Sequence, residues 1–350
     1  MAQKIPATVI TGFLGAGKTT LIRHMLGHAQ GKRIALIINE FGDLGVDGDI
    51  LKGCGDETCT EDDIMELSNG CICCTVAEDF IPTLEKLLDR PEPPDHIVIE
   101  TSGLALPQPL VRAFNWPEIR TRVTVDGVVT VVDGKAVEDG RFAHNLDAVD
   151  AQRKADENLD HETPLSELFD DQIACADMIV VNKTDLLADA GTGLSARLKD
   201  EARSGVQVVK STMGALPVDV LLGQGIGAEN DLDARHEVHH HHHHDDDDHD
   251  DDDHHDHDHD DFESFVLDLN EVADANGFLE KLADVIRAHD ILRLKGFASI
   301  KGKPMRLTIQ AVGPRIDSYF DGRTDQDRRT RLVVIGQSGL DRAAIEASLT

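Results

Sequence analysis

The chain contains 350 residues with a formal net charge of −32 at pH 7, and no apolar run approaches the length of a membrane span. Nucleic acids and anionic membranes require a basic footprint, so this acidic balance argues against both as partners. Residues 236–261 hold 13 of the acids and neither Lys nor Arg, yet the remainder still carries −19. Because Met1 leads into the first apolar segment without a basic leader, we expect a cytoplasmic protein whose six cysteines are thiols.

Short apolar runs alternate with helical stretches from residue 1 to about residue 220, and the length allows a second domain. Such runs are typical of strands that are buried on both faces of a parallel sheet. The alternation predicts a doubly wound α/β domain with a mostly parallel sheet. The predicted strands are Ala7–Ile10, Ile34–Asn39, His96–Glu100, Gly127–Asp133, Met178–Asn182 and Gly205–Val209.

A smaller α+β domain is predicted after the His- and Asp-rich run. Its elements are strand Phe262–Leu269, helix Gly277–His289, a hairpin of Leu292–Ile300 with Met305–Gln310, strand Arg331–Ile335 and helix Asp341–Leu349. The predicted boundaries are therefore 1–233 for the first domain, 234–261 for a disordered linker and 262–350 for the second domain. The second domain shows no catalytic motif, and we expect it to dock a partner.

The first predicted strand runs directly into T-G-F-L-G-A-G-K-T-T, which matches G-x-x-x-x-G-K-[ST] and precedes a stretch with helical spacing. This order of strand, glycine loop and helix N-terminus is typical of a phosphate-binding P-loop. Lys18 would reach the β- and γ-phosphates, and the Thr19 hydroxyl would hold Mg²⁺. The predicted nucleotide-binding residues here are Gly12, Phe13, Leu14, Gly15, Ala16, Gly17, Lys18, Thr19 and Thr20.

A second strand ends in Asn182-Lys183-Thr184-Asp185, which matches the N-K-x-D guanine reader of GTPases. The Asp185 carboxylate would accept hydrogen bonds from guanine N1 and N2, and Asn182 would address the other edge of the base. Adenine presents the opposite pattern of donors, so the carboxylate discriminates against it. We therefore predict GTP as the nucleotide, with Lys210–Thr212 as a further candidate part of the base pocket.

The segment Ile97–Gly103 is the candidate Walker B motif, because it ends a strand with an acid. Glu100 would reach the Mg²⁺ shell, directly or through water, and the Gly103 N–H would meet the γ-phosphate. Lys18, Thr19 and Glu100 are the predicted catalytic residues. Leu104 stands where many signalling GTPases place a water-orienting Gln, so we expect slow intrinsic hydrolysis.

Three of the six cysteines lie within Gly70-Cys71-Ile72-Cys73-Cys74. Thiolates are soft ligands that suit zinc, cobalt and copper(I), so Cys71, Cys73 and Cys74 are predicted to bind the transported metal. A redox pair and inert buried thiols are the alternatives, although the thioredoxin-like context of redox sites is missing. The cluster lies between two strands where GTPases keep their switch segments, so metal binding could depend on the nucleotide.

Other candidate ligands are less specific. Glu40, in N-E-F-G, could contact Mg²⁺ or the second metal, or be an exposed loop acid. Cys54 and Cys59 could form an accessory site or be incidental thiols in a mobile loop. The run 236–261 contains His239–His244 and cannot bury a core. We interpret it as a low-affinity metal buffer; a purification tag and a plain acidic linker are the alternatives.

Taken together, these motifs resemble the CobW branch of the CobW/HypB/UreG/ArgK group of P-loop GTPases, and the resemblance covers both domains. The resemblance implies a metallochaperone that couples GTP hydrolysis to metal release. It further implies GTP, Mg²⁺ and Co²⁺ (or Zn²⁺) as cofactors and cargo. Similarity to CobW proper implies cobalt delivery for cobalamin biosynthesis, with cobaltochelatase as the metal-acceptor protein. Whether the protein forms a homodimer is left open.

Three alternatives remain at this stage. Zinc-handling relatives share the same motifs, so the protein could be a zinc chaperone. It could also be a metal storage or sensing protein that the nucleotide regulates. A P-loop kinase with structural thiols is the third alternative, against which Asn182 and Asp185 argue.

Overall fold

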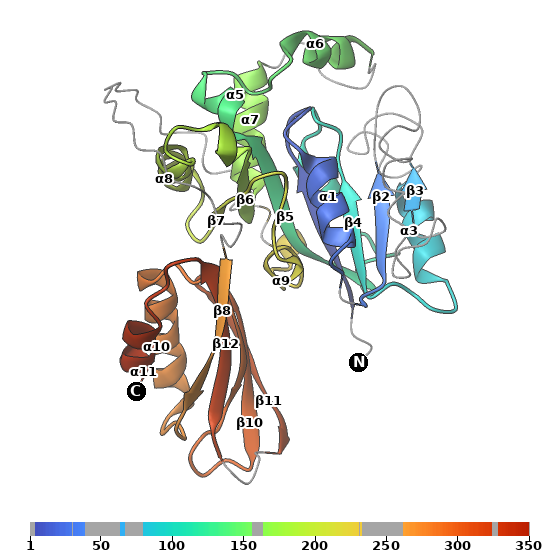
Figure 1. Ribbon diagram of the computed structural model, residues 1–350. Coiled ribbons are helices and arrows are strands. Elements are labelled where there is room, and N and C mark those ends of the chain that lie inside the picture. The colour runs from blue at the N-terminus through green and yellow to red at the C-terminus, as the bar shows by residue number, and fades with distance from the viewer. Residues whose placement is uncertain are drawn as a thin grey trace. The chain divides into compact units, whose positions relative to one another are not determined.

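The computed structural model describes residues 4–29, 31–38, 64–66, 80–155, 164–230, 232, 262–323 and 328–349. The chain folds as two compact units, Met1–Asp253 and His254–Thr350 (Figure 1). Several predicted metal ligands lie outside the described residues, namely Glu40, Cys54, Cys59, Cys71, Cys73, Cys74 and the run 236–261.

The first unit is built on a seven-stranded sheet in the order β3-β2-β4-β1-β5-β6-β7. Every pairing in this sheet is parallel, which confirms the predicted α/β fold, and β1, which leads into the P-loop, lies at the centre of the order. The strands are β1 (Ile5–Thr11), β2 (Ile34–Ile38), β3 (Ile64–Glu66), β4 (His96–Glu100), β5 (Val123–Asp133), β6 (Met178–Asn182) and β7 (Gln207–Lys210).

Helices cover both faces of this sheet, since β2, β4 and β6 are buried along their whole length. On one face Ile97 and Ile99 pack in a single core with Leu84 and Leu110 from two covering helices. The helices are α1 (Lys18–Leu26), α3 (Ile81–Leu88), α4 (Pro107–Ala113), α5 (Gly134–Glu138), α6 (Leu146–Ala155), α7 (Leu165–Cys175), α8 (Thr192–Glu201) and α9 (Val218–Leu221), with 3₁₀ turns η3 (Thr184–Leu186) and η4 (Ala228–Asn230).

The second unit is an antiparallel sheet in the order β11-β10-β9-β12-β8, with α10 and α11 packed against each other (Figure 1). Its buried side chains form one core between sheet and helices. Exposed and buried residues alternate along β8 and β10, as expected of strands with one solvated face. The elements are β8 (Phe262–Leu269), α10 (Ala275–Ala288), β9 (Arg293–Ala298), β10 (Met305–Val312), β11 (Arg315–Arg323), β12 (Thr330–Gln337) and α11 (Arg342–Leu349).

Sequence analysis missed two strands, β3 and β11. Both are edge strands, and β11 carries Asp317, Asp321 and Gly322, which are depleted in strands. The sequence prediction also started β5 at Gly127, four residues late, because Asp126 interrupts the apolar run.

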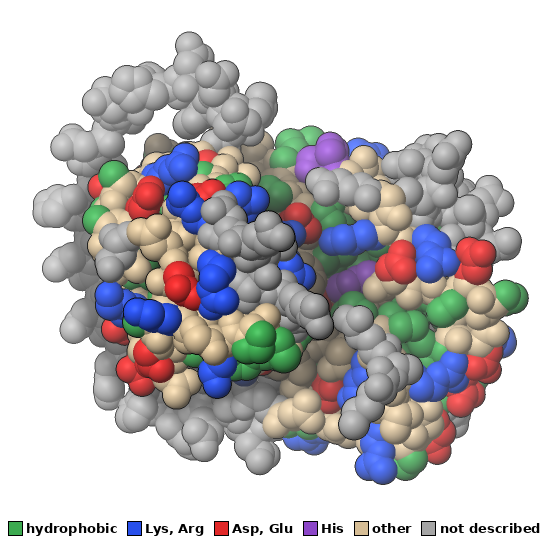
Figure 2. Space-filling view, turned by 90° about the horizontal axis from the view of Figure 1, so that it is seen from below, with side chains coloured by type: hydrophobic (Ala, Val, Ile, Leu, Met, Phe, Trp, Pro, Cys, Tyr) green, Lys and Arg blue, Asp and Glu red, His purple; other side chains and the backbone are tan. Residues whose placement is uncertain are grey.

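The described surface carries charges of both signs. On the face shown in Figure 2, Asp and Glu side chains lie among Lys and Arg. Several of these charges form ion pairs; Arg33, for example, contacts Glu92 and Asp95, each at 3.1 Å. No helix in the described part of the chain has both the length and the apolarity that a membrane crossing requires.

Candidate nucleotide site

The predicted P-loop connects β1 to α1 at the carboxyl end of the sheet, and two of its glycines leave no room for a side chain. Gly12 has φ +135°, and a Cβ atom there would stand 2.1 Å from the Val131 carbonyl oxygen of β5. Gly17 has φ +103°, and its Cβ would stand 2.2 Å from Asn182 Nδ2. The loop is therefore pressed against β5 on one side and the predicted base reader on the other.

The N-terminus of α1 is prepared for an anion. Its N-cap is Gly17, which has no side chain to occupy the first N–H groups, and the first turn holds no acid. Backbone N–H groups at a helix N-terminus and the positive end of the helix dipole both favour phosphate at such a position. Lys18 is buried, and its Nζ donates to the carbonyl oxygens of Gly12 (2.8 Å) and Phe13 (3.4 Å), so its ammonium group lies over the loop.

Thr19 and Glu100 meet beside the P-loop, as their predicted Mg²⁺ role requires. The Thr19 hydroxyl donates to Glu100 Oε1 at 3.2 Å, from the first turn of α1 to the end of the adjacent strand β4. Glu100 is buried, with 6% of its surface exposed. A hydroxyl and a carboxylate oxygen are hard ligands of the kind Mg²⁺ prefers beside phosphates, so the residues present fit this ion.

Gly103 lies directly against the P-loop. A Cβ atom at Gly103 would stand 2.7 Å from the backbone nitrogen of Leu14, so only glycine permits this approach. Gln172 of α7 holds the segment from behind, because its Nε2 donates to the carbonyl oxygens of Gly103 (3.2 Å) and Ala105 (3.3 Å). Leu104 is buried in the apolar core beside Phe13 and cannot orient a water molecule.

Asn182 joins three segments of the site. Its Nδ2 donates to the Ala16 carbonyl oxygen of the P-loop at 2.9 Å, and its Oδ1 accepts from the Gly214 N–H at 3.1 Å. One Nδ2 hydrogen stays available for a base. The Asn182 side chain is only 2% exposed. Its buried amide therefore connects the predicted base reader to the P-loop, although Asn182 and Ala16 are 166 residues apart in the sequence.

The rest of the N-K-T-D segment is held in place by its neighbours. Lys183 has φ +61°, and its Nζ forms an ion pair with the buried carboxylate of Asp133, at the end of β5. The Thr184 hydroxyl contacts the Ser211 carbonyl oxygen at 3.2 Å and the Thr212 hydroxyl at 3.1 Å. Asp185 is exposed, which leaves its carboxylate open to a ligand.

Two residues of this site escaped sequence analysis. Asp133 stood in the sequence only as the last residue of a predicted strand, although an acid at a strand's carboxyl end was a usable signal. Gln172 is the one polar side chain buried within α7 among the described residues, but nothing in the sequence reveals that it reaches Gly103. Both act through contacts between segments far apart in the chain.

The thiol motif, Glu40, Cys54, Cys59 and the run 236–261 stay predictions, because they lie outside the described residues. Within the described part of the chain, His, Cys, Asp and Glu form no group of three or more that could hold a metal ion. Cys175, on α7, is buried and forms no disulfide with another described residue.

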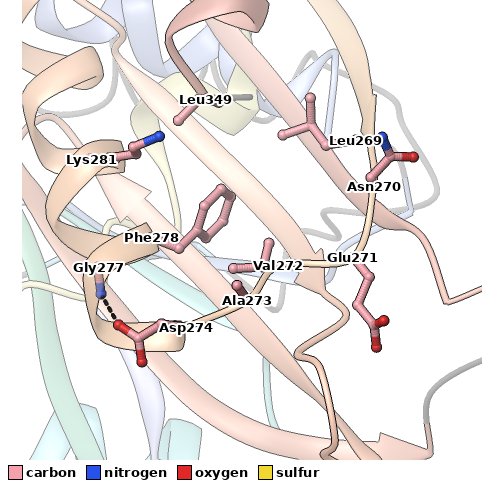
Figure 3. Close-up of a pocket in the computed structure, with 10 residues that line it drawn as sticks. All are labelled: Leu269, Asn270, Glu271, Val272, Ala273, Asp274, Gly277, Phe278, Lys281 and Leu349. Atoms are coloured by element: carbon pink, nitrogen blue, oxygen red, sulfur yellow. Dashed lines mark hydrogen bonds between the residues drawn. The ribbon is translucent and has the colours of Figure 1, made fainter.

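A groove in the second unit is the other candidate site. It has a volume of about 410 Å³ and lies at the start of α10 between Phe278, Leu349 and Lys281 (Figure 3). Its Asp274 carboxylate accepts from the Gly277 N–H at 2.7 Å, so this acid caps the helix. The groove brings together no set of groups for catalysis, and the nucleotide site remains the better candidate.

Comparisons with known proteins agree with this geometry. Residues 6–210 match the CobW/HypB/UreG nucleotide-binding domain, and residues 262–350 match the cobalamin synthesis protein cobW C-terminal domain. The chain is 60% identical to the zinc chaperone CobW of a Sinorhizobium species (99% of this chain, 97% of that protein) and 53% identical to that of Pseudomonas aeruginosa (99% and 91%). It is 30% identical to the zinc chaperone YjiA of Escherichia coli (95% and 94%). The chain therefore belongs to the CobW/HypB/UreG family of nucleotide-binding proteins.

Proposed function

We propose that this protein is a GTP-dependent zinc chaperone that binds Zn²⁺ at Cys71, Cys73 and Cys74 and transfers it to an acceptor protein. The observation that carries the GTP part is the Asn182 amide, which fastens the N-K-T-D segment to the P-loop. A P-loop alone binds any nucleoside triphosphate. A P-loop that is hydrogen-bonded to Asn182, with the exposed Asp185 three residues after it, favours guanine.

In the proposed complex, the Asp185 carboxylate accepts hydrogen bonds from guanine, and Lys183, oriented by Asp133, lies beside the base. The N–H groups at the start of α1 bind phosphate oxygens, and the Lys18 ammonium group turns from the loop carbonyls toward the β- and γ-phosphates. Thr19 and Glu100 would hold Mg²⁺, which when bound offsets the negative charge of the phosphates.

The expected rate of GTP hydrolysis is low. Buried Leu104 has no polar atom at the position after Gly103, so the chain lacks a Gln there to orient the attacking water. A partner or the bound metal would be needed to bring hydrolysis to enzyme-like rates.

The proposed connection between nucleotide and metal is supported by the ends of the described strands. Ile38 pairs with both Glu100 and Glu66, so β2 and β3 end at the same edge of the sheet as the proposed Mg²⁺ ligand Glu100. Cys71 follows Glu66 by only five residues in the sequence, which supports coupling between the thiol motif and this edge of the sheet on chain length alone. We expect GTP to position the thiols and hydrolysis to release the metal.

Zinc is preferred here over cobalt, which the sequence analysis favoured as cargo for cobalamin biosynthesis. Three similar proteins carry zinc chaperone in their names. The order of affinities points the same way, since Zn²⁺ binds most protein sites more tightly than Co²⁺. The prediction that cobaltochelatase is the acceptor depends on cobalt being the cargo, and it is abandoned if the cargo is zinc.

The test is a competitive titration of full-length protein with Zn²⁺ and Co²⁺ in the nucleotide-free, Mg²⁺–GDP and Mg²⁺–GTP states, following thiolate–cobalt absorption. We expect Mg²⁺–GTP to tighten thiolate binding by about ten-fold or more, within the usual range of coupling between sites. Zinc should displace the cobalt, and Cys73→Ala should abolish the absorption. Equal affinity in all three states would indicate metal storage or sensing instead.

A further inference from the structure

A pair of histidines lies at the C-terminal end of α1, away from the nucleotide site and from the cysteine motif. His24 is in the last turn of the helix, and His28 follows its C-cap, Gly27. The two rings stack, with centroids 4.3 Å apart and planes inclined by 28°. His24 is half-buried and His28 is exposed, so both rings are at the surface on the same side of the helix.

A hydrogen bond fixes which nitrogen of His28 can bind a ligand. His28 Nδ1 lies 2.8 Å from the His24 carbonyl oxygen. A carbonyl oxygen only accepts, so Nδ1 must carry the hydrogen, and in the neutral ring the lone pair is then on Nε2. Metal-bound histidines commonly have this arrangement, with one ring nitrogen held by a carbonyl group and the other on the metal.

The spacing and the place in the helix also suit a cation. His24 and His28 are four residues apart, which is the spacing of the two histidines in H-E-x-x-H zinc enzymes, although His28 lies just past the C-cap of α1. Two nitrogens on one tetrahedral zinc, each about 2.0–2.1 Å from it, are about 3.3 Å apart, so binding requires the His24 ring to turn about χ2 while His28 keeps its hydrogen bond. The end of a helix carries partial negative charge from its last carbonyl groups, which favours a cation there.

From this geometry we infer that His24 and His28 form a second binding site for a divalent cation of the zinc class, with two imidazole ligands. Because no group of three potential ligands occurs among the described residues, water or a partner's side chain completes the coordination. Two protein ligands hold zinc more weakly than the three thiolates of the proposed cargo site, so this site is expected to exchange its ion quickly.

The experiment is histidine footprinting of the full-length protein with diethyl pyrocarbonate, which modifies accessible imidazole nitrogens and is read residue by residue with peptide mass spectrometry. At a free Zn²⁺ concentration about ten times Kd, about one site in ten is empty, so labelling of His24 and His28 should slow about ten-fold. Exposed His144 is the internal control, and Mg²⁺, which prefers oxygen ligands, should protect neither histidine.

Single substitutions decide whether the two rings share one ion. In His24→Gln, zinc should no longer protect His28, and in His28→Gln it should no longer protect His24. Protection of either ring without the other, or labelling in the native chain that zinc does not change, would overturn the proposal. Nucleotide-independent zinc binding at the thiols would contradict the proposed chaperone cycle but leave this footprint unchanged, so the two failures are distinguishable.

Discussion

The two units of this protein differ most in the polar side chains that they bury. In the described part of the second unit, the buried polar side chains are Ser299 and Thr330, both uncharged. The first unit buries a set of charged groups within and around its parallel sheet: Lys18, Glu100, Asp126, Asp133, Asp177 and Glu229. A buried charge is costly unless it is hydrogen-bonded, so each of these groups implies a purpose in the fold or at the site.

Buried charge alone does not mark the functional end of the sheet. Asp126, Asp177 and Glu229 serve the strands near the amino-terminal half of β5: Glu229, for example, accepts from the Val125 N–H at 2.9 Å and from the Thr124 hydroxyl at 2.7 Å. Lys18 and Glu100 lie at the carboxyl end, where loops meet. The position along the strand, rather than burial, therefore separates the buried groups that hold loops in place from those proposed to bind the nucleotide.

The largest expected effect comes from one added methyl group in either unit. Gly12→Ala and Gly296→Ala each place a Cβ atom 2.1 Å from a carbonyl oxygen, of Val131 and Arg331 respectively. Because the P-loop must then move from β5, Gly12→Ala should weaken GTP binding by about 100-fold or more, or about 2.7 kcal/mol. A fluorescent GTP analogue measures this affinity.

Gly296→Ala should instead separate β9 from β12 and destabilise the second unit by about 1–3 kcal/mol, the usual cost of overpacking. Hydrogen exchange of peptides from these two strands reports that loss, with GTP affinity unchanged. If Gly296→Ala weakened nucleotide binding as much as Gly12→Ala, the division of roles between the units would be wrong.

The next effect compares one substitution, Asp→Asn, in a buried and an exposed setting. Asp126 accepts from the Gly223 N–H at 2.5 Å and the Gly225 N–H at 2.7 Å, whereas exposed Asp274 accepts from the Gly277 N–H at 2.7 Å. Asp126→Asn turns an amide toward one of these donors and should cost about 1.5–3 kcal/mol of unfolding free energy. Asn caps a helix as well as Asp, so Asp274→Asn should be nearly neutral. Urea unfolding measures both, and equal costs would contradict the comparison.

The smallest effect concerns a surface ion pair of the first unit. The Arg33 side chain and its backbone N–H donate to Asp95 and hold the pKa of that carboxyl below its ordinary value of 3.8. A lowered pKa stabilises the fold above pH 4, and this contribution disappears as pH falls through the folded-state value. Asp95→Asn should therefore reduce stability slightly at pH 7 and less at pH 3.

Urea unfolding at both pH values checks this difference. The matched control is Glu118→Gln, which alters an exposed carboxylate that the described residues engage in no ion pair. A larger penalty for Asp95→Asn at pH 3 than at pH 7 would show that the sign is wrong.

Sequence analysis succeeded where local pattern determines structure. The fully buried strands β2, β4 and β6 follow from apolar runs, and the P-loop from glycine spacing. It failed at β11, an edge strand that carries polar residues.

Contacts between distant segments were equally beyond sequence analysis. The bond from Gln172 to Gly103 spans 69 residues, and the ion pair of Lys183 with Asp133 spans 50. The sequence around either residue of such a pair does not reveal the contact, because the contact depends on the order of the strands in the sheet.

The contact between Gly17 and Asn182 restricts how this nucleotide site can be redesigned. The Asn182 amide fills the space beside Gly17, where a Cβ atom would stand 2.2 Å from Asn182 Nδ2. Replacing Asn182 so that the site accepts another base would empty this space and remove the hydrogen bond to the Ala16 carbonyl oxygen. A substitution at position 182 that is meant to change base selectivity would therefore also disturb the P-loop. A library that varies position 182 should vary position 17 with it.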